Sequence, residues 1–323
     1  MDAPTPARDL TFDLLRGAAV LYIVGYYHIQ EVWLVHLPGT LSGWLARVAL
    51  ALFCFLSGYF LSQRAEINHW AAAGRFYWRR LLKIYPLYLA ALSAFVVLGL
   101  CPKVLFWPSA LLINTVLNWN LLTLWFVSMI FLFYLLTPLY LFHPSIWKTG
   151  VLTVFLVGLI VLVRSTSGWI DPRIPPNLAA FAIGIGLTQS PRLRAAFFAP
   201  IPLVRVASLA ILGAMFAGQF RTPPHDGAWT HAVSIVVWFI AALPWLIIAG
   251  RWLSGVIPVR VIEVLSTASF ILYLSHRIIY HFGEEIYLAP TPILRQFFYL
   301  IVLLPVALGF SYFAQKAYGR LVK

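Results

Sequence analysis

Long apolar runs recur along the chain from Leu10 to Tyr318, and short polar segments separate them. A run of about twenty apolar residues can cross the roughly 30 Å hydrocarbon core of a bilayer as a helix. The alternation of polar and apolar residues that marks an outer-membrane barrel is absent. The pattern therefore predicts ten membrane-spanning helices, over residues 11–33, 44–63, 82–100, 121–142, 147–164, 176–189, 202–219, 230–250, 262–282 and 293–315.

Composition agrees with an all-α, polytopic membrane protein. Hydrophobic residues make up 62% of the chain and charged residues 10%, whereas roughly a quarter of the residues of an ordinary soluble domain are charged. Mean hydropathy is +0.87. The connections are short, and the longest polar one runs from residue 63 to residue 80. We expect a single integral membrane domain over residues 1–323, built as a helix bundle with no separate soluble domain.

The net charge of +13 follows the topology. With the N-terminus in the cytoplasm, most of the Lys and Arg side chains fall in connections on the cytoplasmic side, as the positive-inside rule requires. This places both termini in the cytoplasm and makes a nucleic-acid partner unnecessary. A multi-pass location in a bacterial cytoplasmic (inner) membrane is expected. Cys54 and Cys101 form neither a disulfide framework nor a metal-binding spacing, so no metal is predicted.

The first apolar run carries four polar side chains that need an explanation: Asp13, Arg16, His28 and Glu31. Charges inside a membrane are costly and often mark functional sites. His28 and Glu31 are three residues apart, so on a helix they share a face and form a base with an orienting carboxylate. In the structural alternative, Arg16 extends to the interface and His28 hydrogen-bonds a neighbouring helix.

A basic cluster, Arg79, Arg80 and Lys83, lies at the predicted cytoplasmic start of the third apolar run. Guanidinium groups bind phosphate oxygens in a bidentate manner, so the cluster suits a phosphate-bearing ligand. The alternative is a topological anchor that also contacts anionic membrane lipids.

Three further side chains are candidates for substrate contact. Tyr273 and His276 are three residues apart in the ninth apolar run and face the same way. Trp125 belongs to an aromatic band in the fourth run. For all three the structural alternative is ordinary packing, or for Trp125 a place in the lipid-facing aromatic belt.

Five segments together resemble the acyltransferase 3 family of integral membrane O-acyltransferases, in the family's order and over nearly the whole chain. They are FDLLRG at 12–17 followed by His28, FLSGYFL at 55–61 with Arg64, RRLLKIYPLY at 79–88, LWF at 124–126 with Tyr134 and Pro138, and SFILYLSH at 269–276.

The resemblance implies a ten-helix bundle that moves an acyl group, usually acetyl, from coenzyme A to a hydroxyl. Acceptors in the family are sugars of surface polysaccharides, lipid-linked glycans or secondary metabolites. The family's catalytic arginine and histidine correspond to Arg16 and His28, and its donor-binding Arg-x-x-Arg pair corresponds to Arg80 and Lys83. Acyl-CoA is then the co-substrate.

The chain departs from the family pattern at two positions. The usual spacing places the histidine at the position of Tyr27, one residue earlier, and one residue turns a regular helix by about 100°. We therefore expect either a π-bulge that restores the phase or a different geometry. Lys83 replaces the second arginine, which keeps the charge but loses the bidentate fork.

These residues define one hypothesis for the chemistry. Acyl-CoA docks at Arg79, Arg80 and Lys83, and His28 acts as general base on the acceptor hydroxyl. Glu31 orients His28, while Arg16 binds the donor's phosphates or pairs with Asp13. An acyl-histidine intermediate is an alternative that the sequence leaves open. The sequence also leaves open two other functions: a transporter or flippase for a polysaccharide or small acid, and a non-catalytic scaffold. The oligomeric state and the acyl length are not determined by the sequence.

Overall fold

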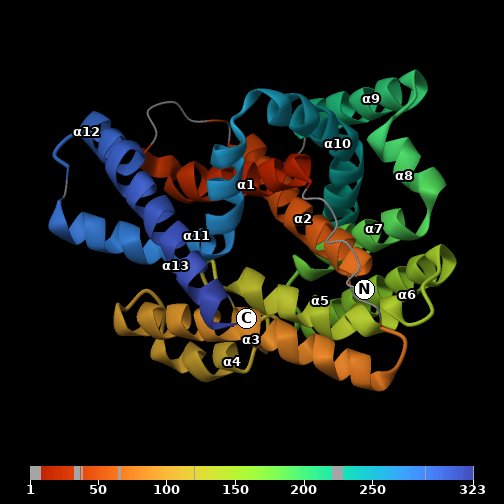
Figure 1. Cartoon of the computed structure of the whole chain (residues 1–323), viewed down its shortest axis with the longest axis horizontal. Helices are drawn as coiled ribbons and strands as arrows, with labels where there is room; N and C mark the ends of the chain where they lie inside the picture. The colour runs from red at the N-terminus through yellow and green to blue at the C-terminus, as the bar shows by residue number, and fades with distance from the viewer. Residues whose placement is uncertain are drawn as a thin grey trace.

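The computed structural model of the chain describes residues 9–32, 37, 39–64, 67–119, 121–219, 228–287 and 289–322. Within these ranges every regular element is helical, as the apolar runs predict. Figure 1 shows α1 and α2 near the middle, with α3 along one side and α9 and α10 on the opposite side.

In chain order the elements are α1 (Leu10–Gly25), the 3₁₀ segment η1 (Tyr27–Val32), α2 (Gly39–Arg64), α3 (Trp70–Val97), the 3₁₀ turn η2 (Lys103–Leu105), α4 (Phe106–Ala110), α5 (Trp125–Leu141), α6 (Ile146–Ser167), α7 (Ile174–Gln189), α8 (Pro191–Phe198), α9 (Pro202–Gln219), α10 (Ala228–Val256), α11 (Val259–Ile286), α12 (Pro292–Phe297), the π-helical segment η3 (Phe298–Leu303) and α13 (Leu304–Leu321).

The outer helices carry apolar side chains that the rest of the described chain leaves uncovered. In α6, Val151, Val154 and Phe155 are 68%, 75% and 63% exposed, and only 11% of the helix's most apolar window is buried. In water such a surface would be unstable, whereas a hydrocarbon environment accommodates it without cost. The chain is an integral, multi-pass membrane protein.

The number of spans remains a prediction. Among the described residues, six helices are long and apolar enough to cross a membrane, or seven if α8 and α9, which meet at a 67° bend, are one span. Helices α1, α5 and α7 coincide with predicted spans but have only 16 or 17 residues. Which side of the membrane holds the termini also remains a prediction.

The predicted polar connection over residues 63–80 is wrong in its second half, because α3 begins at Trp70. His69 caps this helix: its Nδ1 accepts a hydrogen bond from the Ala72 backbone amide at 2.9 Å. Three alanines then follow Trp70 and favour helix over loop. As a result, the basic cluster lies within the first half of a long helix, where side chains three residues apart share a face.

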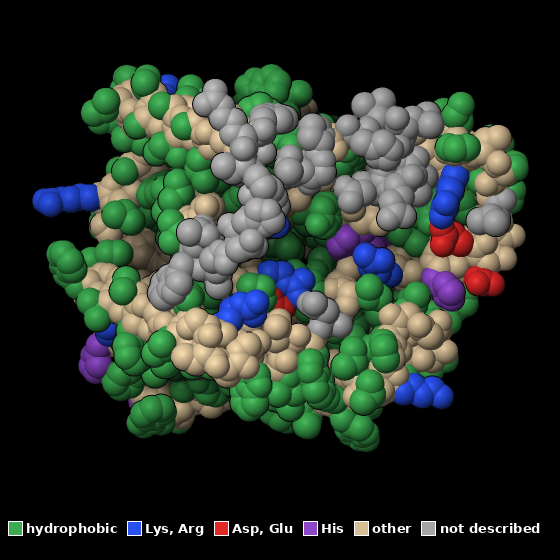
Figure 2. All heavy atoms as spheres, turned by 180° about the vertical axis from the view of Figure 1, so that it is seen from behind, with side chains coloured by type: hydrophobic (Ala, Val, Ile, Leu, Met, Phe, Trp, Pro, Cys, Tyr) green, Lys and Arg blue, Asp and Glu red, His purple; other side chains and the backbone are tan. Residues whose placement is uncertain are grey.

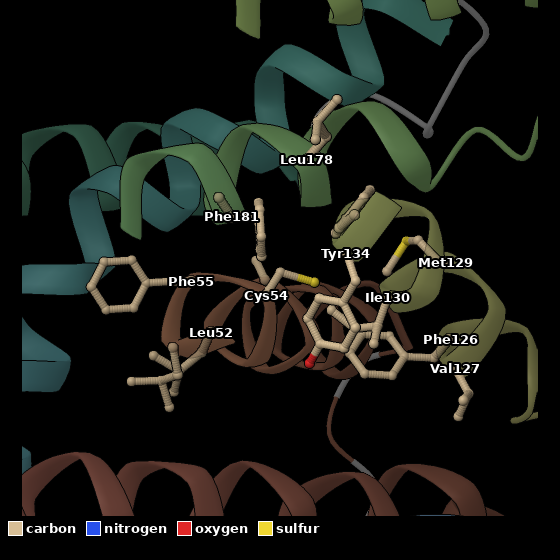
Figure 3. Close-up of a cluster of buried hydrophobic side chains, with 14 of the residues drawn as sticks. Leu52, Cys54, Phe55, Phe126, Val127, Met129, Ile130, Tyr134, Leu178 and Phe181 are labelled. Carbon is tan, nitrogen blue, oxygen red and sulfur yellow. The ribbon is translucent and has the colours of Figure 1, made fainter. Parts of the chain in front are cut away.

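The centre of the bundle is the packing of α2 against α7, with α5 beside them. Figure 3 shows side chains from all three helices in one buried cluster, to which Phe55, Met129 and Phe181 belong. Two glycines permit the close approach. A Cβ atom at Gly58 would overlap the Phe181 carbonyl oxygen, and one at Gly184 would overlap the Phe55 carbonyl oxygen. Small residues at such contacts are typical of membrane helix pairs.

Alanine at Gly58 is expected to destabilise the protein by about 1–3 kcal/mol or more, because overpacking against a backbone atom forces α2 and α7 apart. The matched control is Gly150→Ala in α6, where nothing lies within 4 Å of the new Cβ and helix propensity improves by about 1 kcal/mol. The midpoint of thermal unfolding in detergent measures both variants. Equal midpoints for the two would contradict the close approach at Gly58.

Candidate active site

The start of α1 is tied to α11 by a small polar network. Asp9 caps α1 by accepting a hydrogen bond from the Thr11 amide at 3.0 Å. One turn later, Arg16 pairs with the buried Asp13 at 3.0 Å. Ser266 of α11 donates to the same Asp13 oxygen at 2.6 Å and accepts a hydrogen bond from Arg16. The three side chains thus hydrogen-bond one another between the two helices.

His28 does not continue the first helix, so the predicted helix over 11–33 is wrong beyond Gly25. Tyr26 leaves the helical region with φ −128° and ψ −66°, after a glycine, which has the lowest helix propensity apart from proline. The chain continues as the 3₁₀ segment η1, which carries His28. The one residue by which the Arg16–His28 spacing exceeds the family pattern could be accommodated by a π-bulge or by a different geometry. The structure shows a different geometry and no π-bulge in this segment.

In this geometry His28 meets His276 of α11. The Nδ1 atom of His28 lies 2.9 Å from the Nε2 atom of His276. The two rings are parallel within 3°, with centroids 5.0 Å apart. Glu31 lies in the same 3₁₀ segment, but its side chain is outside the described residues. The pairing of Glu31 with His28 therefore stays a prediction, and the partner that the structure gives His28 is another histidine.

The three predicted substrate contacts occupy different surroundings. His276 is fully buried. Tyr273 is buried too, and its hydroxyl donates to the Thr123 carbonyl oxygen at 2.8 Å. Trp125 lies under the Arg173 guanidinium, which stands 3.6 Å from its ring centroid. The indole face of Trp125 is thus already covered by this chain's own arginine.

A cavity of about 310 Å³ lies beside these elements. Three basic residues from two helices line it: Arg16 of α1 and Arg80 and Lys83 of α3. The Arg80 guanidinium stands 5.6 Å from the Phe76 ring centroid and 5.5 Å from that of Tyr134. Arg79 is exposed and is not among the residues that line the cavity. Figure 2 shows Lys and Arg side chains gathered near the middle of one face of the molecule, with histidine side chains beside them.

One face of α11 connects the cavity with the histidine pair. Ser266, Ser269 and Tyr273 line the cavity and follow one another at intervals of three and four residues. His276 comes three residues later on the same face. Tyr273 stands at the junction: its ring centroid is 5.5 Å from that of Phe126, which also lines the cavity, and 6.1 Å from that of His276.

Arg277, next to His276, is a further polar residue of α11 that the sequence motifs did not single out. Its Nε atom is buried and has no hydrogen-bond partner in the described part of the chain. The guanidinium interacts electrostatically with His28, His276 and Tyr273. Its position within an apolar run is the sequence signal that could have marked it as a functional candidate. Its placement adds a positive charge beside the two rings.

The described residues contain no group of three or more His, Cys, Asp and Glu side chains placed to hold a metal ion. The arrangement offers a histidine pair next to Tyr273, which lines a cavity that also carries cations and hydroxyl groups. This combination suits a reaction in which a phosphate-bearing donor is held by its charges while a proton moves at an imidazole.

Comparison with known proteins supports this interpretation. A family model described as an acyltransferase domain, that of the acyltransferase 3 family, matches residues 9–312. Neither a curated protein nor a solved structure matches the chain. The family match spans α1, η1, α2, α3, α5 and α11, which carry the histidine pair and all the cavity-lining residues except Gln315 of α13. The chain therefore belongs to the acyltransferase 3 family.

Proposed function

We propose that this protein transfers an acyl group, in the simplest case acetyl, from coenzyme A to a hydroxyl. The acceptor is a sugar of a surface or exopolysaccharide, a lipid-linked glycan or a related metabolite, and the protein lies in a bacterial cytoplasmic membrane. One observation carries the proposal: a single face of α11 lines a cationic cavity and then presents His276 to His28.

The cavity supplies the charge that an acyl-CoA donor needs. Coenzyme A bears several phosphate groups, and Arg80 can bind one through two parallel hydrogen bonds. Lys83 acts as a point charge. Arg16 lines the same cavity, while its contacts with Asp13 and Ser266 hold its side chain in place. The pantetheine arm then follows the hydroxyl-lined face of α11 toward Tyr273.

His28 serves as general base in this proposal. Its imidazole takes the proton of the acceptor hydroxyl as the oxygen attacks the thioester carbonyl carbon. The tetrahedral intermediate collapses with loss of the thiolate of coenzyme A, and the proton passes from the imidazolium to this leaving group. The products are the acyl ester and free coenzyme A. Arg277 contributes a positive charge near the place where the carbonyl oxygen becomes negative.

Purified protein in lipid nanodiscs, supplied with acetyl-CoA and hydroxyl acceptors, is expected to release free coenzyme A and to form an ester-linked acetyl group. A thiol reagent measures the first product and mass spectrometry the second. Oligosaccharides from envelope glycans provide the acceptors. Comparison of these glycans from cells with and without the gene identifies the natural one.

The same assay separates the proposed activity from transport. A transporter or flippase would move the glycan across the bilayer with no release of coenzyme A. Transport without any acceptor-dependent release of coenzyme A would therefore contradict the proposal. A scaffold would do neither, and substitution of Arg16 or His28 would then change only the amount of protein.

A further inference from the structure

His276 is held by its own helix in a way that determines which of its nitrogens carries the proton. Its Nδ1 atom lies 3.1 Å from the Leu272 carbonyl oxygen and 2.9 Å from the Tyr273 carbonyl oxygen. A carbonyl oxygen only accepts hydrogen bonds, so Nδ1 must be the donor. In a neutral imidazole the other nitrogen then carries no proton, and Nε2 of His276 is a hydrogen-bond acceptor.

The tautomer of His276 determines the tautomer of His28. Because Nε2 of His276 accepts, Nδ1 of His28 must donate across the 2.9 Å contact. His28 then carries its proton on Nδ1, and its Nε2 atom keeps a free electron pair. Only this arrangement satisfies all three hydrogen bonds when both rings are neutral. His28 Nε2 is the atom that a general base needs.

We propose that His276 is a positioning residue that keeps His28 in the tautomer with a basic Nε2; this inference rests on the proposed function. His276 occupies the place that a carboxylate has behind the histidine of a Ser-His-Asp triad. In this chain the orienting group is uncharged, so burying it does not require a counterion.

The surroundings of the pair keep the two rings in one orientation. The Tyr273 and Tyr280 rings lie on either side along α11, with centroids 6.1 and 5.7 Å from that of His276. The Tyr280 hydroxyl reaches back to the Val24 carbonyl oxygen in α1 at 3.3 Å. The helix that carries His276 is thereby joined to the last turn before the segment that carries His28.

The hydrogen bond also has a role during proton transfer. When His28 Nε2 takes the hydroxyl proton, the ring becomes an imidazolium whose Nδ1–H still donates to His276. A hydrogen bond from a charged donor is roughly twice as strong as a neutral one. His276 therefore stabilises the charged intermediate without taking the proton, and the proton leaves by Nε2 to the thiolate.

Two variants of His276 separate positioning from packing. In His276→Gln the amide oxygen can replace Nε2 as acceptor, whereas His276→Ala removes the acceptor. We expect kcat to fall by about 10²-fold or more in His276→Ala, since the wrong tautomer disables a general base. The glutamine variant should stay within about 10-fold of the parent protein. KM for acetyl-CoA should change little in either, and Ser275→Ala, at the neighbouring buried position that faces Ser311 of α13, controls for packing in α11.

The tautomer of His28 can be measured directly, without an activity assay. Nitrogen-15 NMR of histidine-labelled protein in lipid should show His28 protonated at Nδ1 and unprotonated at Nε2. The signal should shift toward the other tautomer in His276→Ala and remain in His276→Gln. Parent protein with His28 protonated at Nε2 would overturn the inference, as would full kcat in His276→Ala. If His28→Ala also kept full activity, the proposed function itself would fail, so the two failures are distinguishable.

Discussion

Alanine at His28 is expected to lower kcat for acyl transfer by about 10²–10⁴-fold, the usual contribution of a general base. KM for acetyl-CoA should stay nearly constant, because His28 is not among the residues that line the cationic cavity. Release of free coenzyme A by equal amounts of folded protein gives both constants. A purified His28→Ala variant with undiminished kcat would exclude His28 as the base.

The matched control is Tyr27→Phe. Tyr27 holds the position at which family members usually carry the histidine, and it lies in the same 3₁₀ segment, with its ring centroid 5.7 Å from that of His28. Phenylalanine keeps the ring and removes only the hydroxyl, so we expect near-parental kcat. A large loss in Tyr27→Phe with little loss in His28→Ala would show that the hydroxyl of Tyr27, and not the imidazole, takes part in the reaction.

Loss of the charge at Arg80 is expected to raise KM for acetyl-CoA by about 10–100-fold, since hydrogen bonds to charged groups contribute about 1.5–3 kcal/mol. The test variant is Arg80→Met, which preserves most of the length of the side chain. Arg80→Lys should give an intermediate KM because it keeps the charge and loses the bidentate fork. Initial rates over a range of acetyl-CoA concentrations provide the measurement.

Arg79 offers a control from the adjacent position. It belongs to the same predicted cluster but is exposed and outside the cavity lining. Arg79→Met should therefore change KM much less than Arg80→Met. A larger increase of KM in Arg79→Met than in Arg80→Met would place the donor on the outer surface of α3, away from the cavity. Thermal unfolding of both variants shows whether the contacts of Arg80 with Phe76 and Tyr134 also matter for stability.

The donor can be varied together with the protein. Acetyl-dephospho-CoA lacks one phosphate group, and its KM should be higher than that of acetyl-CoA for the parent protein. If Arg80 binds the missing phosphate, Arg80→Met and loss of the phosphate should have less than additive effects on binding. Fully additive effects would mean that Arg80 contacts another part of the donor.

The sequence predicted the helices better than their ends. Apolar runs locate helices because each must be long and apolar enough for a membrane, and this requirement is visible residue by residue. The end of α1 at Gly25 depends on one backbone conformation at Tyr26. The start of α3 at Trp70 depends on a cap by His69, and histidine is an uncommon capping residue.

Contacts within one helix could be predicted, whereas contacts between distant helices could not. Pairing with Asp13 is one of the two roles expected for Arg16 from the sequence, and the structure contains this pair. The partner of His28 lies 248 residues away in the chain, and no local pattern identifies it. For the same reason, the sequence showed neither that Arg173 covers Trp125 nor that Arg277 lies beside the two rings.

The link between Asp13, Arg16 and Ser266 has a consequence for biosynthesis. Ser266 follows Arg16 by 250 residues, and at about 5–20 residues per second a ribosome needs roughly 12–50 s to reach it. During that time the first helix must hold its charges without α11. The pairing of Arg16 with Asp13 inside one helix compensates both charges, so they can enter the bilayer as a neutral pair. Ser266 then joins this pair, and the proposed active site is completed only when nearly all of the chain has been made.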